Sequence, residues 1–352
     1  MVQGVLTSIL IYSTIIMYWS SVSRVDRRRF FMKDFKLVTE QVDLLKSRGM
    51  LFEDEQDAIC KLLSDNYYNI INGYKDLFLD ATNNQEVFKT GTTFNEIYAL
   101  YEFDNQLKNI FLEYILKIEN ILRTQVAYHF SSFHGNDNYL KIDNFDTFSY
   151  NTFINPNLKE KQIKHIQLLI SNLNKKIADS ISSTKYINHY IMNYGFIPLW
   201  VLVNILSFGD ICNFYKLMNQ NERIHITMFW GISDNDLKSF LGILCHTRNL
   251  CAHNERLFNY SFPTRETIND TNYHNLLNIP SINNRFQYGK NDLFAVMIVL
   301  KTLLTKEDYQ KFHSKIYSRL KSIESKIKTI SLNDILVAMN FPYNWHSLLK
   351  MS

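Results

Sequence analysis

Proline and glycine are scarce in this chain of 352 residues, which has only 5 prolines and 10 glycines. Folds that reverse the chain every few residues need more of both, so long helices are favoured over many short strands. No segment alternates apolar and polar residues over a useful strand length. The composition therefore predicts an all-α protein, and the hydrophobic fraction of 46% is normal for a globular chain.

Cysteine is also rare, and the 4 cysteines form no C-x-x-C pair. This predicts a reduced, cytoplasmic protein. A metal site built from Cys245, His246, Cys251 and His253 would fit no standard zinc spacing, so neither a metal nor a cofactor is expected.

The chain also lacks a large excess of charge of either sign. The net charge is +4, and residues 1–31, with four Arg and one Asp, supply +3 of it, which leaves +1 for the remainder. The overall charge is therefore no evidence for nucleic-acid binding, and any basic surface must be local.

Aromatic side chains, by contrast, are plentiful, with 21 Tyr and 25 Phe. Most of them must fill core space. The others are available to stack on unpaired bases.

The first 31 residues differ from the rest. No charge occurs from Met1 to Ser23, and a basic cluster follows at residues 24–29. A cleaved signal peptide would carry its basic residues before the apolar run, so it does not fit. Three interpretations remain: a membrane anchor that leaves the bulk of the protein in the cytoplasm, a buried helix, or a translated leader upstream of a true start at Met32.

Helical periodicity recurs along the remainder, with no internal repeat and no Pro- or Ser-rich linker. Gly49 is the residue type expected just past the end of the first helix. An Asn-rich segment, residues 134–157, is typical of a surface loop. The expected helices cover residues 39–48, 53–66, 94–130, 159–180, 199–219, 236–257, 292–304, 307–328 and 332–339.

The helix expected at residues 94–130 has a polar stripe and a charged pair away from it. The stripe, at i, i+4, i+7 and i+11, consists of Glu113, Lys117, Asn120 and Thr124. Glu119 and Arg123 are also i, i+4, but apolar residues flank them. Such a pair is either a buried ion pair or part of a site.

A second pattern is the segment Arg248-Asn249-Leu250-Cys251-Ala252-His253. The R-x4-H spacing alone is weak, because chance supplies about one comparable match in a chain of this composition. Arg123 and His129 form such a match.

Helical geometry makes the first match, Arg248 and His253, more informative. His253 lies about 140° round the helix from Arg248, whereas Asn249 and His253 are i, i+4 and share a face. A polar stripe is expected opposite Leu237, Leu241 and Leu244, and it contains Gly242, His246, Asn249, His253 and Arg256. The same pattern also suits the plain polar face of an amphipathic helix.

Arginine and histidine together suit RNA cleavage. RNA carries its own nucleophile, the 2′-hydroxyl next to each phosphate. A histidine with a pKa of about 6.5 can take up that proton or protonate the leaving oxygen. An arginine supplies a permanent charge and paired donors to the phosphorane-like transition state. The expected products are a cyclic 2′,3′-phosphate and a 5′-hydroxyl.

The full string, Arg248 to His253, resembles the R-N-x-x-A-H motif of HEPN ribonucleases. Its surroundings resemble the AbiD/AbiF (Abi-like) abortive-infection family. The further landmarks are residues 44–50, 66–74 and 118–124, Pro198-Leu199-Trp200 with Ser207-Phe208-Gly209, and Phe341-Pro342-Tyr343-Asn344-Trp345. The resemblance covers Lys33 to Leu348 and leaves residues 1–31 outside. It implies an all-helical HEPN-type bundle, with an N-terminal helical part at residues 32–93 and a core at 94–348 that includes inserted elements.

The resemblance also implies a function in phage defence. Arg248 and His253 would be the catalytic pair, with Asn249 as the usual polar residue after the arginine. RNA would be the substrate, and a small non-coding RNA is an expected partner. HEPN sites combine two facing motifs, and this chain has one, so a homodimer is implied. The alternative is a non-catalytic RNA-binding protein in which the same residues only bind.

Further RNA contacts are expected on two surfaces. Beside the motif they would come from His246, Asn254 and Arg256. A basic stripe at i, i+4 spacing suits phosphates, although a solvated helix face explains it equally well, and it contains Lys311, Lys315, Arg319 and Lys326. A weaker candidate consists of Lys159, Lys161, Lys164, Lys175 and Lys176.

Overall fold

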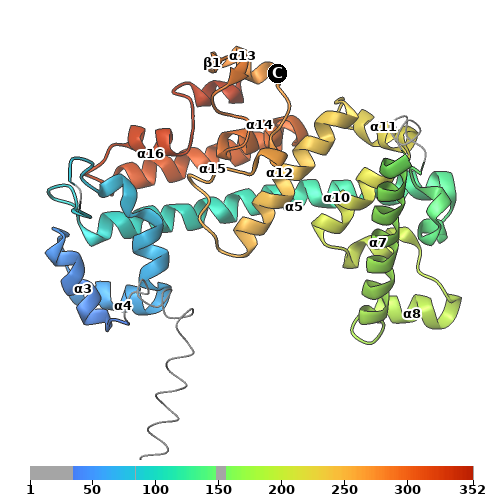
Figure 1. Cartoon of the computed structure of the whole chain (residues 1–352), viewed down its shortest axis with the longest axis horizontal. Helices are drawn as coiled ribbons and strands as arrows, with labels where there is room; N and C mark the ends of the chain where they lie inside the picture. The colour runs from blue at the N-terminus through green and yellow to red at the C-terminus, as the bar shows by residue number, and fades with distance from the viewer. Residues whose placement is uncertain (1–34, 84, 148–155, 352) are drawn as a thin grey trace, which may run out of the picture.

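The computed structural model describes residues 35–83, 85–147 and 156–351 (Figure 1). The interpretations of residues 1–31 concern a segment outside this range. Within the described range, no helix combines the length and the apolarity needed to cross a membrane. The only sheet in the same range is a hairpin of β1 (Ser281–Ile282) and β2 (Arg285–Phe286). The prediction of an all-α fold is confirmed.

One long helix, α5 (Phe94–His134), forms the axis of the molecule. It begins with a capping box in which Thr93 and Glu96 exchange hydrogen bonds, and it ends at Gly135 with φ 82°. The stripe predicted from Glu113 to Thr124 is exposed, as expected. The opposite side of α5 is buried along most of its length, which makes this helix the surface on which the other elements pack.

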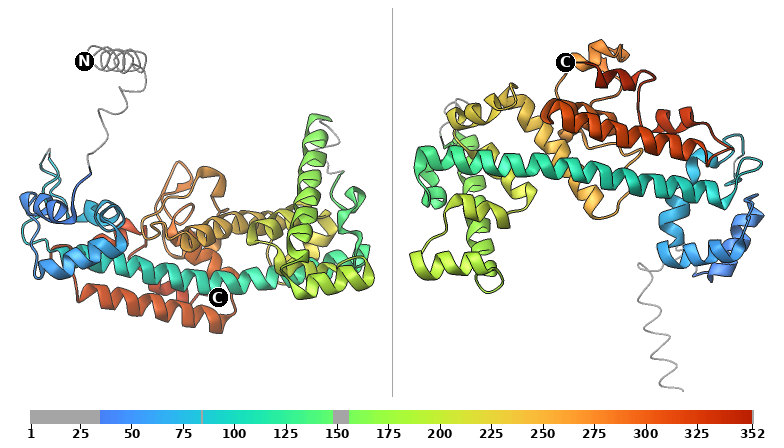
Figure 2. Two further views of the ribbon diagram at one scale, coloured as in Figure 1. Left: turned by 90° about the horizontal axis from the view of Figure 1, so that it is seen from below. Right: turned by 180° about the vertical axis from the view of Figure 1, so that it is seen from behind.

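The N-terminal elements lie at one end of α5, and α7 and α8 lie at the other (Figures 1 and 2). Buried side chains from both ends belong to one hydrophobic cluster. The division into residues 32–93 and 94–348 stays a prediction. The elements at the two ends are α3 (Val38–Ser47), α4 (Glu55–Asp65), η1 (Tyr68–Asn72), η2 (Lys75–Phe78), η3 (Asn138–Leu140), η4 (Ile142–Asn144), α7 (Pro156–Ile181) and α8 (Lys185–Tyr194).

The elements between α8 and the C-terminus pack along α5 and on one another. Helix α12 crosses α5, whereas α15 runs beside it (Figures 1 and 2). Helix α14 is buried on all sides, consistent with its nearly continuous apolar sequence. The elements are α9 (Leu199–Leu202), η5 (Val203–Ile205), α10 (Phe208–Leu217), α11 (Gln220–Met228), α12 (Asp234–Ala252), η6 (Thr264–Glu266), α13 (Asn272–Leu276), α14 (Leu293–Leu303), α15 (Lys306–Glu324), α16 (Leu332–Ala338) and η7 (Trp345–Leu349).

Several predicted boundaries were wrong for identifiable local reasons. The helix expected at residues 199–219 is interrupted, because Ser207 adopts extended dihedrals and caps α10 through a capping box with Asp210. The segment expected as a surface loop holds η3 and η4, and it buries Tyr139 and Phe145 in the core. Helices α8 and α11 were not predicted at all.

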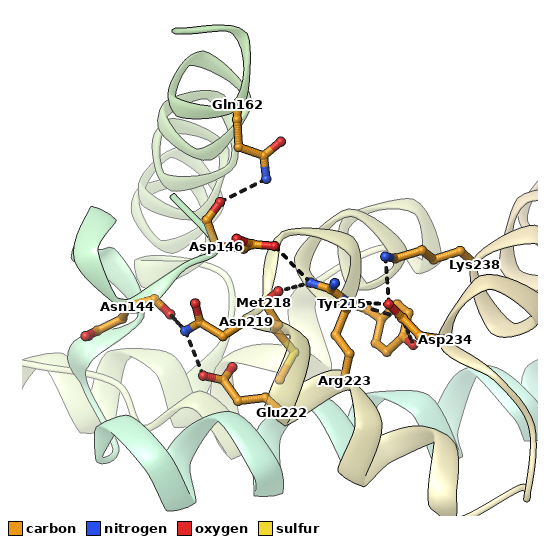
Figure 3. Close-up of polar contacts among 10 residues, drawn as sticks. All are labelled: Asn144, Asp146, Gln162, Tyr215, Met218, Asn219, Glu222, Arg223, Asp234 and Lys238. Atoms are coloured by element: carbon orange, nitrogen blue, oxygen red, sulfur yellow. Dashed lines mark hydrogen bonds and ion pairs between the residues drawn. The ribbon is translucent and has the colours of Figure 1, made fainter. Parts of the chain in front are cut away.

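A buried polar network holds the start of α12 in place (Figure 3). Arg223 of α11 is 5% exposed, and its Nε donates to the carboxylate of Asp234, the first residue of α12, at 3.0 and 3.2 Å. Tyr215 and Lys238 donate to the same carboxylate at 2.7 and 2.8 Å. Burial opposes ionisation of Asp234, but these hydrogen bonds and the charge of Arg223 hold its pKa below the ordinary value.

Candidate active site

The motif residues lie at the C-terminal end of α12, which is held on its inner side by leucines. Leu237, Leu241 and Leu244 were expected opposite the motif, and all three are fully buried. The predicted helix at residues 236–257 was too long at this end. It stops at Ala252, His253 is the C-cap, and Asn254 adopts φ 56°, in the left-handed region.

The early end of α12 removes Arg256 from the predicted stripe. Its guanidinium lies off the helix and donates to the carbonyl oxygen of Gly73. Asn254 accepts a hydrogen bond from Lys108 of α5, which is 4% exposed. Both residues therefore hold the segment after the motif against neighbouring elements, and the expectation that Arg256 shares a helix face with His253 was wrong.

A buried carboxylate on α5 holds the same segment. Asp104 is fully buried and accepts hydrogen bonds from the backbone N–H groups of Leu257 and Phe258 at 3.0 and 2.7 Å and from the Tyr74 hydroxyl at 2.6 Å. Burial raises the pKa of Asp104 despite these bonds. Neither Asp104 nor Lys108 was predicted as a functional residue from the sequence. Their spacing of i, i+4 was the one available signal.

Arg248 faces the predicted ion pair of α5. Its side chain is 32% exposed, and its Nε lies 3.8 Å from Oε2 of Glu119, which is 1% exposed. The other carboxylate oxygen of Glu119 pairs with Arg123, whose Nη2 also donates to the carbonyl oxygen of Leu206 at 2.8 Å. Glu119 and Arg123 thus form an ion pair beside the motif arginine, as the first interpretation expected, and the second, that the pair is part of a site, stays a prediction.

The contact between Arg248 and Glu119 is close enough for attraction but too long for a hydrogen bond. Among the described residues, neither Arg248 Nε nor Glu119 Oε2 has a hydrogen-bond partner. Buried polar atoms without partners are costly and are concentrated at functional sites. The guanidinium of Arg248 is therefore held beside the carboxylate by charge, and no hydrogen bond to a described residue engages its Nε.

His253 and Asn249 are both exposed on the face that Arg248 flanks. Their side chains do not hydrogen-bond each other in the described structure, and only the backbone N–H of His253 bonds to the carbonyl oxygen of Asn249, at 2.9 Å. The predicted orientation of the imidazole by the amide is therefore not present in a single chain. The imidazole ring has both nitrogens open to solvent or a partner.

Small residues separate Arg248 from His253 on this face of α12. Ala252, Cys245 and Asn249 lie between them in angle, at about 40°, 60° and 100° from Arg248. Cys251, inside the motif, points inward, and burial raises the pKa of its thiol to about 12, so it is a neutral, small core residue. A helix face that carries side chains of this size allows another element to approach closely.

A cavity of about 390 Å³ opens beside the motif between α10, α12 and η6. Its lining includes Asn249, His246, Lys216, Glu255 and Glu266. The predicted RNA contact His246 is engaged inside the protein, because its Nε2 lies 3.0 Å from the Tyr260 hydroxyl. In the described residues, no three or more His, Cys, Asp or Glu side chains are placed to share a metal ion.

The predicted basic stripe lies on α15, which packs on α5. Lys315 pairs with Glu113 of α5 at 2.6 Å, and Lys311 pairs with Glu307 at 2.6 Å. Arg319 donates to Gln106 and, with Lys315, lines a cavity of about 470 Å³ between the two helices. Lys326 lies beyond the end of α15, so the expected continuous stripe is shorter than predicted. The weaker candidate lysines lie on α7, where Lys176 pairs with Asp210 at 3.2 Å.

The central part of the chain matches a known protein family. A family model described as "Abi-like protein" matches residues 61–259, more than half of the chain. That range contains α5 and all of α12 with the motif. No curated protein and no solved structure matches the chain. The chain therefore belongs to the Abi-like protein family, and this membership suggests a role in abortive-infection defence against phage.

Proposed function

We propose that the chain is a phage-defence endoribonuclease of the HEPN type, in which Arg248 and His253 cleave RNA by attack of the 2′-hydroxyl. The observation that carries the proposal is the contrast between these two side chains. Arg248 is half-buried against a carboxylate, with Nε unpaired, whereas His253 is exposed at the helix end with its ring free. One is a fixed charge, and the other is an accessible proton carrier.

The proposed roles of His253 and Arg248 follow from these environments. His253 takes the proton from the 2′-hydroxyl or gives one to the 5′-oxygen that leaves. Arg248 donates to the phosphoryl oxygens as negative charge accumulates on them, and Glu119 holds it in place. The nucleophile belongs to the substrate, so this chemistry requires proton transfer and charge stabilisation from the protein. Asn249, exposed next to both, is a candidate to orient the phosphate or the imidazole of a partner chain.

A homodimer is part of the proposal, because Arg248 and His253 flank opposite edges of one helix face. A single chain presents the pair splayed about 140° apart. Asn249 and Ala252 lie between them and are exposed, which leaves room for the same helix of a second copy. Each groove would then receive residues of both motifs. Light scattering should give twice the chain mass of 41.7 kDa, and a monomer at micromolar concentration would contradict this arrangement.

A small non-coding RNA remains a proposed partner. The cavity between α5 and α15 supports this, since Lys315, which is exposed, and Arg319, which is half-buried, line it on one side. Their ion pair and hydrogen bond to α5 are surface interactions that a phosphate can replace at little cost. The substitution Lys315→Glu should weaken RNA binding. It should also reduce the slope of log affinity against log salt concentration by the amount expected for about one phosphate contact.

The catalytic assignment is tested with purified wild type and His253→Ala incubated with total RNA in EDTA. His189→Ala provides a matched control, because His189 is exposed on α8, away from the motif. We expect cleavage by wild type and by His189→Ala and none by His253→Ala. Equal cleavage by His253→Ala would refute the assignment. RNA binding without cleavage by wild type would favour the alternative, a non-catalytic RNA-binding protein.

A further inference from the structure

A second cavity, of about 640 Å³, lies between α5 and the segment of α9 and η5, and Arg123, the ion-pair partner of Glu119, lines it. Its volume is within the range of pockets that hold one small ligand. Its lining combines two exposed aromatic side chains with several polar and two small apolar ones. The residues that carry the argument are Arg123, Tyr128, Ser131, Trp200 and Asn204.

The aromatic side chains of this cavity are unusually exposed. Tyr128 is 68% exposed and Trp200 is 51% exposed, although burying a large apolar ring would be favourable. They come from different elements, α5 and α9, and both line the cavity. Two such rings at one opening offer the flat faces on which an unpaired base stacks.

Polar atoms around the rings are left without partners. Arg123 Nε and Ser131 Oγ are buried, and neither makes a hydrogen bond to a described residue. Asn204 uses its amide nitrogen on the carbonyl oxygens of Trp200 and Val201, which leaves its side-chain oxygen as an acceptor. Donors and acceptors of both kinds are thus present, as hydrogen bonding to the edge of a base requires.

The charge of the cavity favours a base over a phosphate. Arg123 is its one cationic lining residue, and Glu119 neutralises it through a buried ion pair. An anion placed here would meet the carboxylate together with the guanidinium. A neutral, flat ligand with hydrogen-bonding edges does not incur that repulsion.

The position of the cavity connects it to the motif. Glu119 contacts Arg123 with one oxygen and faces Arg248 with the other, so the two guanidinium groups lie on opposite sides of one carboxylate. Arg123, which lines the cavity, and Arg248 of the motif therefore face the same carboxylate. We propose that this cavity binds one unpaired base of an RNA strand, stacked on Trp200 and Tyr128, and so positions the adjacent phosphodiester at the motif.

This inference rests on the proposed function, because it assigns the cavity to the RNA substrate. Binding is therefore measured without cleavage, in the His253→Ala background, by fluorescence anisotropy of a labelled single-stranded RNA oligonucleotide. Adding Trp200→Ala should weaken binding roughly 5- to 150-fold, the range for loss of one base-stacking contact. Trp200→Phe should restore most of the affinity. Tyr343→Ala, at a side chain that is 96% exposed and distant in sequence from the cavity residues, should leave it unchanged.

Three further measurements distinguish an unpaired RNA base from other possible occupants of the cavity. A perfect duplex of the same sequence should bind at least tenfold more weakly, and a free mononucleotide should not compete at equal concentration. Unchanged affinity of the Trp200→Ala chain for the single strand would overturn the proposal, as would equal competition by the mononucleotide, which would indicate a nucleotide-effector site. Loss of the dimer on Trp200→Ala substitution, seen by light scattering, would assign the surface to protein contacts and overturn it as well.

Failure of this inference is distinguishable from failure of the proposed function. If wild type binds the strand through Trp200 but does not cleave it, the cavity assignment stands and the catalytic one falls. If wild type cleaves and Trp200→Ala changes neither affinity nor cleavage, the cavity assignment alone falls.

Discussion

Glu119 provides a direct test of how the fold prepares the motif arginine. Replacing Glu119 by Gln keeps the shape and removes the charge between Arg123 and Arg248. Breaking a buried ion pair by removing one partner costs about 3–5 kcal/mol, because the remaining charge is uncompensated. Here the carboxylate is 1% exposed, Arg123 is 20% exposed, and the amide retains some hydrogen bonding. We therefore expect the Glu119→Gln chain to lose about 3 kcal/mol of unfolding free energy.

Equilibrium unfolding in urea measures the stability loss, and cleavage kinetics measure the effect on the motif. At a temperature where the variant remains folded, we expect a lower kcat with little change in KM, because Arg248 is less well oriented when charge develops on the phosphate. Arg123→Ala breaks the same ion pair but leaves the carboxylate beside Arg248. It should raise KM more than it lowers kcat, since Arg123 lines the proposed base cavity.

Two results would contradict the role given to Glu119. A Glu119→Gln chain within about 0.5 kcal/mol of wild type would show that the ion pair is not needed for stability. Identical changes in kcat and KM for Glu119→Gln and Arg123→Ala would show that both act only through the fold, and that Glu119 does not position Arg248.

Two further predictions concern stability. Arg223→Ala should cost about 1.5–3 kcal/mol in urea unfolding, because it removes the buried guanidinium that donates to Asp234 and leaves Lys238 as the remaining cation on that carboxylate; a loss below about 1 kcal/mol would contradict the role given to this network. His313 is 5% exposed, and burial, followed by the charge of His346, lowers its pKa to about 4. Since the folded value lies below the unfolded value of about 6.5, its contribution is present above pH 6.5 and is lost as pH falls towards 4. It amounts to about 3 kcal/mol. His313→Gln should flatten the stability profile in this window, and an unchanged profile would assign the acid sensitivity to other groups.

The sequence indicates most of the helices that place the motif, because their apolar periodicity is strong. The exposed stripe of α5 and the buried leucines of α12 follow directly from a repeat of 3.6 residues. Helix α11 was not predicted, because its apolar periodicity is weak. It buries Glu222 and Arg223, so its inward face is not apolar in the sequence. Their partners come from other elements: His134 for Glu222, and the carboxylates of Asp146 and Asp234 for Arg223.

The candidate site was predictable in its residues but not in its arrangement. Arg248, His253, Glu119 and Arg123 are all visible in the sequence as a motif or a misplaced charged pair. Their connection through one carboxylate depends on how α12 crosses α5, which is a tertiary contact. The end of α12 likewise depends on Asn254 and its hydrogen bond from Lys108, a residue far away in the chain. Local propensity carries no information about such partners.

The most direct test of the central claim is the chemistry of the RNA ends left by the purified protein. Fragments produced in EDTA are incubated with polynucleotide kinase and labelled ATP, with and without prior phosphatase treatment. Attack by the 2′-hydroxyl predicts 5′-hydroxyl ends that label equally well without phosphatase, and a substrate with 2′-deoxyribose at the cleavage position should stay intact. Arg248→Ala and His253→Ala should give no such ends. Fragments with 5′-phosphates, or cleavage at the deoxy position, would contradict the account.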